Sequence, residues 1–351
     1  MTAASGNRRF GPFMASLAAL ALTLGISFGL VILLILLLSA TPGKAIFAFF
    51  IGPFANSYFL GNMLNAAVPL VFTGLGVAIA FKASVFNLGG EGQIYAGGLA
   101  ATAVCLALPA ANGYLGGALS LAAAMLLSGV IAGLSGYFRM RWNANEMISS
   151  FLLSAAVILV VNHFITGPLD DPGNNLLATL PIGPQYHLAR IFPPSLLNAS
   201  APFALLAAAA VALFMFRSHA GYEMRMCGLN REFSRYGGIN VSAYLVLPMI
   251  ISGALHGLGG GLMVMGTYHA AIQGYSFGTG WNGIAVALIA KNNPFGVIPA
   301  ALLFSYLDAG AKAAMLGSDL TSEIASIAQS FIFYLVTAQA LFAFAHRRRK
   351  A

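Results

Sequence analysis

The feature that most constrains this chain is the near absence of charge from long stretches of its sequence. Uncharged apolar segments occupy about residues 14–40, 62–81, 92–110, 114–138, 147–167, 201–216, 242–266 and 324–345. A ninth segment, 295–316, holds only one Asp and one Lys, and a tenth, 281–290, is short. A helix needs about 20 mainly apolar residues to cross a bilayer. Charged residues make up only 7% of the chain, against about 25% in soluble domains. The pattern therefore predicts an all-α integral membrane protein of about ten segments.

The distribution of basic residues orients these segments. Cytoplasmic loops of membrane proteins carry an excess of Lys and Arg. If the N-terminus lies inside and the segments alternate, 14 of the 17 basic residues fall on the inner side. The three on the outer side are Lys44, Arg190 and Lys312. We therefore expect a single transmembrane domain over residues 1–351 with both termini in the cytoplasm. Cys105 and Cys227 fall on opposite sides, so no disulfide between them is expected.

The longest inner loop, residues 217–241, is predicted to hold two short helices. The first ends near Gly228, and Asn230 can cap a second that begins at Arg231 and stops at Gly237. Both arginines of the second helix then lie on one face, because they are four residues apart. One interpretation is an ordinary basic anchor on the inner side of the membrane. The other is a rigid knob that meets a cytoplasmic motor.

The outer loop, residues 168–200, is rich in proline. Its six prolines are Pro168, Pro172, Pro181, Pro184, Pro193 and Pro194. Proline fixes the backbone angle φ and lowers the conformational entropy of the unfolded chain. The loop is therefore expected to be a structured cap over the helix ends. Whether it also offers a docking surface to an external partner stays open.

Sequence signatures of catalysis and of nucleotide binding are missing. None of the five lysines is followed by Ser or Thr, so the chain has no P-loop. It also lacks His-Glu-x-x-His and Cys-x-x-Cys metal patterns. We expect no enzymatic activity, no bound metal or cofactor in this chain, and no nucleic-acid partner.

Ionisable side chains inside apolar segments are functional candidates by default, because burying charge in a membrane is costly. Asp308 and Lys312 are four residues apart and can neutralise each other. His163, His256 and His269 lie on or near segments, and each is expected to be a packing residue. A self-sufficient secondary transporter would need a coupling-ion site. That alternative is therefore less favoured.

Residues 86–93, Phe-Asn-Leu-Gly-Gly-Glu-Gly-Gln, place a carboxylate and two amides among glycines between two apolar segments. Glycine permits a sharp turn, and Glu91 at a helix start is stabilised by the helix dipole. The segment is either a capped tight turn or a gate or subunit contact at the membrane boundary.

Several segments together resemble permease subunits of ATP-binding-cassette importers, in the group that carries branched-chain amino acids, ribose-type sugars and nucleosides. They are residues 86–93, Asn145-Glu146-Met147-Ile148-Ser149-Ser150, Gly228-Leu229-Asn230, Arg235-Tyr236-Gly237-Gly238-Ile239 and Gly283-Ile284-Ala285-Val286-Ala287-Leu288. They look most like the simple-sugar and nucleoside branch. One departure is Ser154, where relatives often carry Asn.

The resemblance implies a type II importer permease fold in a bacterial inner membrane. Such a subunit forms the pathway for a nucleoside or simple sugar that an external binding protein delivers. It works with a second permease, usually a non-identical paralogue, and with a cytoplasmic ATPase that binds the ATP and Mg²⁺. The residues expected to couple to that ATPase are Arg225, Gly228, Asn230, Arg231, Arg235 and Gly237. The polar residues expected along the pathway are Asn65, Asn87, Glu91, Asn162 and Gln273.

Overall fold

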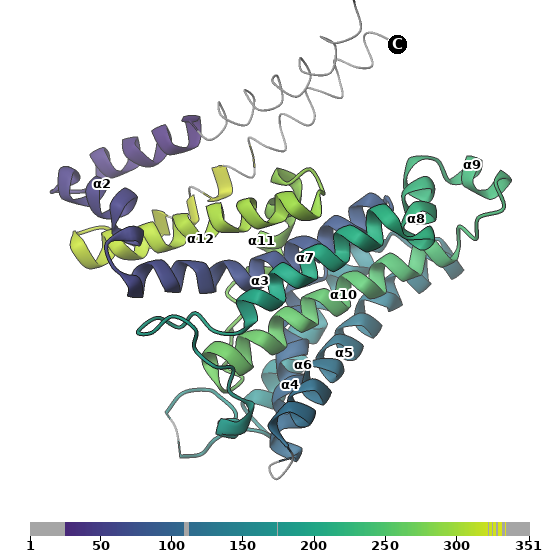
Figure 1. Ribbon diagram of the computed structural model, residues 1–351, viewed down its shortest axis with the longest axis horizontal. Helices are drawn as coiled ribbons and strands as arrows, with labels where there is room; N and C mark the ends of the chain where they lie inside the picture. The colour runs from purple at the N-terminus through teal and green to yellow at the C-terminus, as the bar shows by residue number, and fades with distance from the viewer. Residues whose placement is uncertain are drawn as a thin grey trace, which may run out of the picture. The chain divides into compact units, whose positions relative to one another are not determined.

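The computed structural model describes residues 25–321 except 109–111 and 174, together with 323, 324, 326, 327, 329–331 and 334 (Figure 1). The regular elements of this part are helices, as predicted. Within the described residues, six spans are long and apolar enough to cross a membrane. They are α3 (Ser57–Lys82), α5 (Gly113–Trp142), α6 (Glu146–Ile165), α7 (Ser200–Arg217), α10 (Ala243–Met263) continued by the π-helical turn η3 (Val264–Tyr268), and α12 (Pro294–Gly317).

The remaining elements are shorter. They are the helical stretch Gly25–Leu38, α2 (Pro42–Ile51), η1 (Gly52–Phe54), α4 (Gly90–Ala107), η2 (Pro184–Tyr186), α8 (His219–Leu229), α9 (Arg231–Tyr236) and α11 (Thr279–Ile289). α11 corresponds to the short segment predicted at 281–290. No helix was predicted at α2, which begins with a proline in its first turn, where the missing amide hydrogen costs nothing. Residues 25–40 of the predicted segment 14–40 are described and contain the helix Gly25–Leu38, whereas most of the predicted segment 324–345 lies outside the described residues.

The chain divides into two compact units, one of residues up to Leu60 and from Phe304 onward, and one of Gly61–Leu303. In the first unit α2 and η1 pack against the C-terminal half of α12. The Tyr306 hydroxyl donates to the Phe50 carbonyl oxygen at 3.1 Å, and a Cβ on Gly52 would lie 2.5 Å from the Cβ of Ala313. The predicted Asp308–Lys312 pair forms on α12, with 2.7 Å between Nζ and Oδ2.

In the second unit α4 is the central helix. It packs against α5, α6, α10 and α11, and 13 of its 18 residues are buried. The approach is close because glycines meet. A side chain on Gly97 would clash with the backbone of Gly257, and one on Gly257 would clash with the carbonyl of Ala124 on α5. The sequence predicts this contact, because Gly253, Gly257 and Gly261 form two overlapping Gly-x-x-x-Gly steps on one face of α10.

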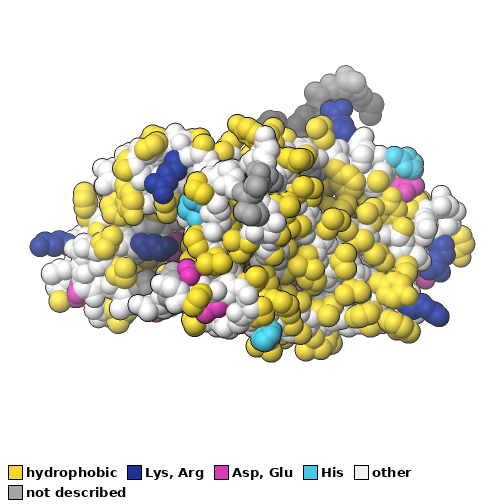
Figure 2. Space-filling view, turned by 90° about the horizontal axis from the view of Figure 1, so that it is seen from below, with side chains coloured by type: hydrophobic (Ala, Val, Ile, Leu, Met, Phe, Trp, Pro, Cys, Tyr) yellow, Lys and Arg dark blue, Asp and Glu magenta, His cyan; other side chains and the backbone are white. Residues whose placement is uncertain are grey.

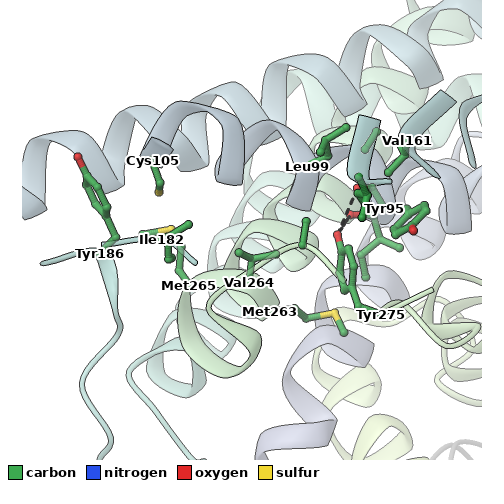
Figure 3. Close-up of a cluster of buried hydrophobic side chains, with 14 residues drawn as sticks. Tyr95, Leu99, Cys105, Val161, Ile182, Tyr186, Met263, Val264, Met265 and Tyr275 are labelled. Carbon is green, nitrogen blue, oxygen red and sulfur yellow. Dashed lines mark hydrogen bonds between the residues drawn. The ribbon is translucent and has the colours of Figure 1, made fainter. Parts of the chain in front are cut away.

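The outer loop is a structured cap, as expected. Its backbone amides at Ile182 and Leu188 donate to the carbonyls of His269 and Met265, at 2.8 and 3.0 Å. Figure 3 shows Ile182 and Tyr186 of this loop among buried side chains of α4, α6 and η3. Figure 2 shows a face of the molecule on which apolar side chains predominate and charged ones are sparse. Both cysteines are free.

Candidate functional site

The inner loop folds into the two helices predicted for it. α8 ends at Leu229, and the Asn230 side chain caps α9 by accepting a hydrogen bond from the Phe233 amide at 3.0 Å. Three large apolar side chains are exposed here: Leu229 (79%), Phe233 (69%) and Tyr236 (93%). Adjacent exposed apolar side chains of this size are typical of a protein-contact surface. We call α8 and α9 together the inner knob.

The inner knob is fastened to the turn between α3 and α4. The Ser84 hydroxyl donates to the Gly228 carbonyl at 2.7 Å, and Nη2 of Arg231 donates to the Ser84 carbonyl at 2.7 Å. A side chain on Gly228 would clash with the carbonyl of Lys82. Arg231 therefore holds the inner knob against the turn between α3 and α4, whereas the Arg235 side chain is exposed.

Two other side chains of α8 face inward. The Arg225 Nε donates to the Gly221 carbonyl at 3.3 Å, and its guanidinium lies 5.6 Å from the centre of the Phe216 ring. Burial raises the pKa of the Cys227 thiol, so this side chain stays neutral and acts as a small apolar contact. The free cationic surface of the knob thus comes mainly from Arg235 rather than from Arg225.

The segment 86–93 comes shortly after Ser84 in the sequence, and two of its side-chain amides bind each other. The side chains of Asn87 and Gln93 exchange two hydrogen bonds of 2.8 and 2.9 Å. Asn87 also donates to Ser252 of α10 at 2.9 Å and accepts from the Gly89 amide at 2.9 Å. Asn87 is fully buried, and all of its polar atoms have partners, which stabilises one conformation of the turn.

One face of α6 completes the hydrogen bonding of this turn. Glu146, Ser150 and Ser154 recur at intervals of four and are all buried. They accept hydrogen bonds from the backbone amides of residues 86, 88 and 92, at 3.3, 3.0 and 2.8 Å respectively. Glu146 also forms an ion pair with Arg139 of α5. We call these three side chains the α6 ladder.

Glu91 joins the same turn to α11. Its Oε1 accepts from the Ser276 hydroxyl at 2.6 Å and from the Gly278 amide at 2.9 Å, and its Oε2 accepts from the Gly280 amide at 2.8 Å. Gly278 precedes α11 with φ of +77°, a conformation that glycine adopts without strain. The carboxylate therefore caps the N-terminus of α11, where the helix dipole favours negative charge.

The other three predicted pathway residues are Asn65, Asn162 and Gln273. Asn162 accepts from the Tyr95 hydroxyl at 2.5 Å, and the same hydroxyl accepts from the Gly274 amide at 2.9 Å, beside the exposed Gln273. Asn65 is partly buried, donates to Thr267 at 3.1 Å and accepts from Asn198 at 3.0 Å. The structure thus links Asn162 to the segment that carries Gln273, and Glu91 accepts from Ser276 farther along the same segment.

Sequence reasoning missed several of these partners. Ser84, Ser252 and Tyr95 each make the hydrogen bonds described above, but a single Ser or Tyr in an apolar segment carries no pattern. The α6 ladder did leave a signal, because polar residues at intervals of four on an apolar helix mark one face. Ser154 is both the departure from the resembled pattern and the last member of that ladder.

Comparison with known proteins decides the family. Residues 59–340 match the family model described as the branched-chain amino acid transport system / permease component. The chain belongs to this permease family. It is 34% identical over 305 residues to a probable riboflavin import permease, RfuC, of Treponema pallidum, covering 87% of this chain and 81% of that protein. It is 31% identical over 321 residues to the guanosine ABC transporter permease NupP of Bacillus subtilis, covering 90% and 91%.

A third relative adds a different solute. The chain is 28% identical over 320 residues to the glucose ABC transporter permease TsgB13 of Haloferax volcanii, covering 86% of this chain and 82% of that protein. A second permease of that organism, TsgC13, also matches this chain. The chain is thus the permease component of an ATP-binding-cassette importer and a multi-pass membrane protein. It is not itself an enzyme, since a separate ATPase binds ATP in such systems.

Proposed function

We propose that this permease forms, with a second and non-identical permease, the pathway of an importer for a nucleoside or a simple sugar. Riboflavin, guanosine and glucose, named for the relatives, share a hydroxylated carbon chain or ring. That common chemistry supports a hydroxylated solute over a branched-chain amino acid. The occurrence of TsgB13 and TsgC13 in one organism supports a pair of unlike permeases. The proposed setting is a bacterial inner membrane, with ten segments and both termini in the cytoplasm.

The observation that carries the proposal is the inner knob and its fastening. Its exposed Leu229, Phe233 and Tyr236 offer an apolar contact to a cytoplasmic ATPase, and Arg235 offers a cation at the rim. Asn230 and Gly237 bound the short helix that presents them. Because Ser84 and Arg231 bind the knob to the turn between α3 and α4, a displacement of the knob moves that turn.

From the turn, the displacement has two routes into the membrane. Glu91 connects the segment 86–93 to α11 through three hydrogen bonds, and the α6 ladder connects it to α6. α6 is the least buried of the long helices, with 22% of its apolar stretch enclosed. We propose that the exposed side of α6 faces the solute pathway or the second permease.

The predicted pathway residues then divide into two groups. Asn162 and Gln273, joined through the Tyr95 hydroxyl and the Gly274 amide, are proposed to contact solute near the outer loop, which receives the external binding protein. Asn65 is proposed to border the same region. Asn87 and Glu91 have every side-chain oxygen in hydrogen bonds, so we propose that they act on the pathway by holding α4, α10 and α11 in place.

The test uses the complete importer in proteoliposomes, with its ATPase, second permease and binding protein. Arg235→Glu is expected to weaken retention of the ATPase on the purified permeases, since it reverses the exposed cation. Arg231→Gln is expected to retain the ATPase but to lower solute uptake per ATP hydrolysed, since it cuts the brace to Ser84. The Arg231→Glu, Arg235→Glu double variant should combine both losses while still inserting into the membrane.

The control is Arg217→Glu, which reverses an exposed charge at the end of α7 outside the knob. Unchanged uptake in the double variant would refute the coupling role. The solute class is tested separately, by uptake of guanosine, ribose, glucose and riboflavin against leucine. Uptake of leucine alone would refute the nucleoside or sugar assignment.

A further inference from the structure

A groove of about 390 Å³ runs between α5 and α10, and its lining is apolar. On α5 the lining residues recur every three or four positions from Met125 to Tyr137, and α10 contributes Val246, Ile250 and Ala254. Met125 and Tyr137 are 12 residue steps apart, so at a rise of 1.5 Å per step the groove is about 18 Å long. It therefore extends along the helices for much of one leaflet of a bilayer.

Two glycines of α5 form the groove. A Cβ on Gly133 would lie 2.7 Å from Cγ1 of Ile250, and one on Gly129 would lie 3.3 Å from the Ile250 carbonyl oxygen. The neighbouring Leu126 and Val130 are 69% and 59% exposed and stand at the rim. A larger residue at either glycine would push α5 and α10 apart or fill the groove between them.

One end of the groove carries aromatic and basic side chains. Tyr137 lies edge-on to Trp142, with 5.8 Å between the ring centres, and Trp142 is 64% exposed. Tyr and Trp gather where a bilayer meets water. Arg141 follows Tyr137 by four residues, so it continues the face of α5 that lines the groove. It is exposed.

Arg141 differs from its neighbour Arg139. Arg139 is held in an ion pair with Glu146. Among the described residues, no ion pair or hydrogen bond engages the Arg141 side chain. The groove therefore ends near a cation without a counter-ion, since Arg141 lies one helical turn beyond Tyr137.

We propose that the groove binds an acyl chain of an anionic phospholipid, whose phosphate is held by Arg141. The apolar lining of the groove suits a hydrocarbon chain, and the exposed Arg141 at its end suits the phosphate of the same lipid. The free guanidinium, next to Trp142 at the level of the headgroups, selects a negatively charged lipid.

Intrinsic fluorescence can test this, because the chain has only two tryptophans, Trp142 and Trp281. In a Trp281→Phe background, Trp142 is the sole reporter. The purified full-length permease is placed in bilayers that mix unlabelled lipid with phosphatidylglycerol or phosphatidylcholine brominated on the acyl chains, which quench nearby tryptophan. We expect phosphatidylglycerol to compete about fivefold better than phosphatidylcholine, the preference that one basic residue at a membrane surface confers.

Variants divide the site into its two parts. Arg141→Gln should bring the preference close to unity, whereas Arg217→Gln, which removes an exposed charge elsewhere, should keep it. Ala254→Phe fills the groove and should weaken competition by phosphatidylglycerol. Ala122→Phe, on an exposed part of α5 outside the groove, should leave it unchanged. Val130→Phe, from the exposed rim, is a second filling variant if Ala254→Phe does not fold.

Three outcomes would overturn the proposal. Equal competition by the two lipids in the Trp281→Phe protein excludes selective binding. An unchanged preference in both groove-filling variants means that the groove takes no part. Loss of quenching by both lipids in the fully assembled importer means that a partner subunit, not lipid, covers the groove.

Discussion

Replacing Glu91 by Gln removes the charge that caps α11 and leaves a side chain of the same shape. The carboxylate accepts three hydrogen bonds and is only 8% exposed. In the less costly orientation, the amide oxygen keeps the Ser276 and Gly278 bonds, and the amide nitrogen faces the Gly280 amide. The lost bond to a charged acceptor costs about 1.5–3 kcal/mol. The lost interaction with the helix dipole adds about 0.3–2 kcal/mol.

Together these terms give about 2–5 kcal/mol of local stability, which is about a 30-fold to few-thousand-fold change in the opening equilibrium of α11. Hydrogen exchange of peptides covering Thr279–Ile289, in purified permease, measures that opening. We expect faster exchange there by at least about 30-fold in Glu91→Gln. Glu146→Gln is the matched control, because it removes another buried carboxylate of the same turn that does not contact α11.

The control should speed exchange around residues 84–88 and leave α11 protected. If Glu91→Gln abolished solute uptake while α11 exchanged at the wild-type rate, the capping argument would be wrong. Glu91 would then act on the solute itself, as the sequence-based prediction held.

Two further predictions concern the ends of the helices. Gly228→Ala should destabilise the permease by about 1–3 kcal/mol in thermal unfolding, because the new Cβ would meet the last carbonyl of α3; Gly237→Ala, whose Cβ would make only ordinary contacts, should not. Burial, together with His187 and Arg190, lowers the pKa of His269 below its usual 6.5, so the folded outer loop, which carries His187 and Arg190, favours the neutral imidazole. The protection of the outer-loop amides from hydrogen exchange should therefore be full above about pH 6.5 and should fall below that pH. His187→Ala should weaken this pH dependence, and protection that does not change with pH would contradict the reasoning.

The inner knob shows how much the sequence could predict. A residue able to cap a helix, six residues of helix and two glycines are local signals, and they predicted α9 with its boundaries. The glycines of α10 likewise predicted close packing. Both predictions depend only on residues that are close together in the sequence or that share one face of a helix. Such relations can be read from a single sequence.

What the sequence could not predict depends on distant partners. Nothing local to Arg231 indicates that it donates to the carbonyl of Ser84, 147 residues away. The expectation that Arg231 and Arg235 form one cationic face was therefore incomplete, since one braces and one is exposed. Asn87 and Glu91 were grouped with Asn162 by polarity alone. Only the three-dimensional contacts distinguish Asn87 and Glu91, whose polar side-chain atoms all have hydrogen-bond partners, from Asn162, which lies beside the exposed segment that carries Gln273.

The enclosure of α4 bears on how the permease is made. α4 has 18 residues, yet it is not among the six spans that qualify by length and apolarity, because it carries Glu91, Gln93 and several glycines. Its polar atoms find partners on α5, α6 and α11, all of which are synthesised after it. A newly made α4 therefore enters the bilayer before most of its hydrogen-bond partners exist. Its stable insertion must wait for α11, nearly 200 residues later, so the membrane domain matures as a unit rather than helix by helix.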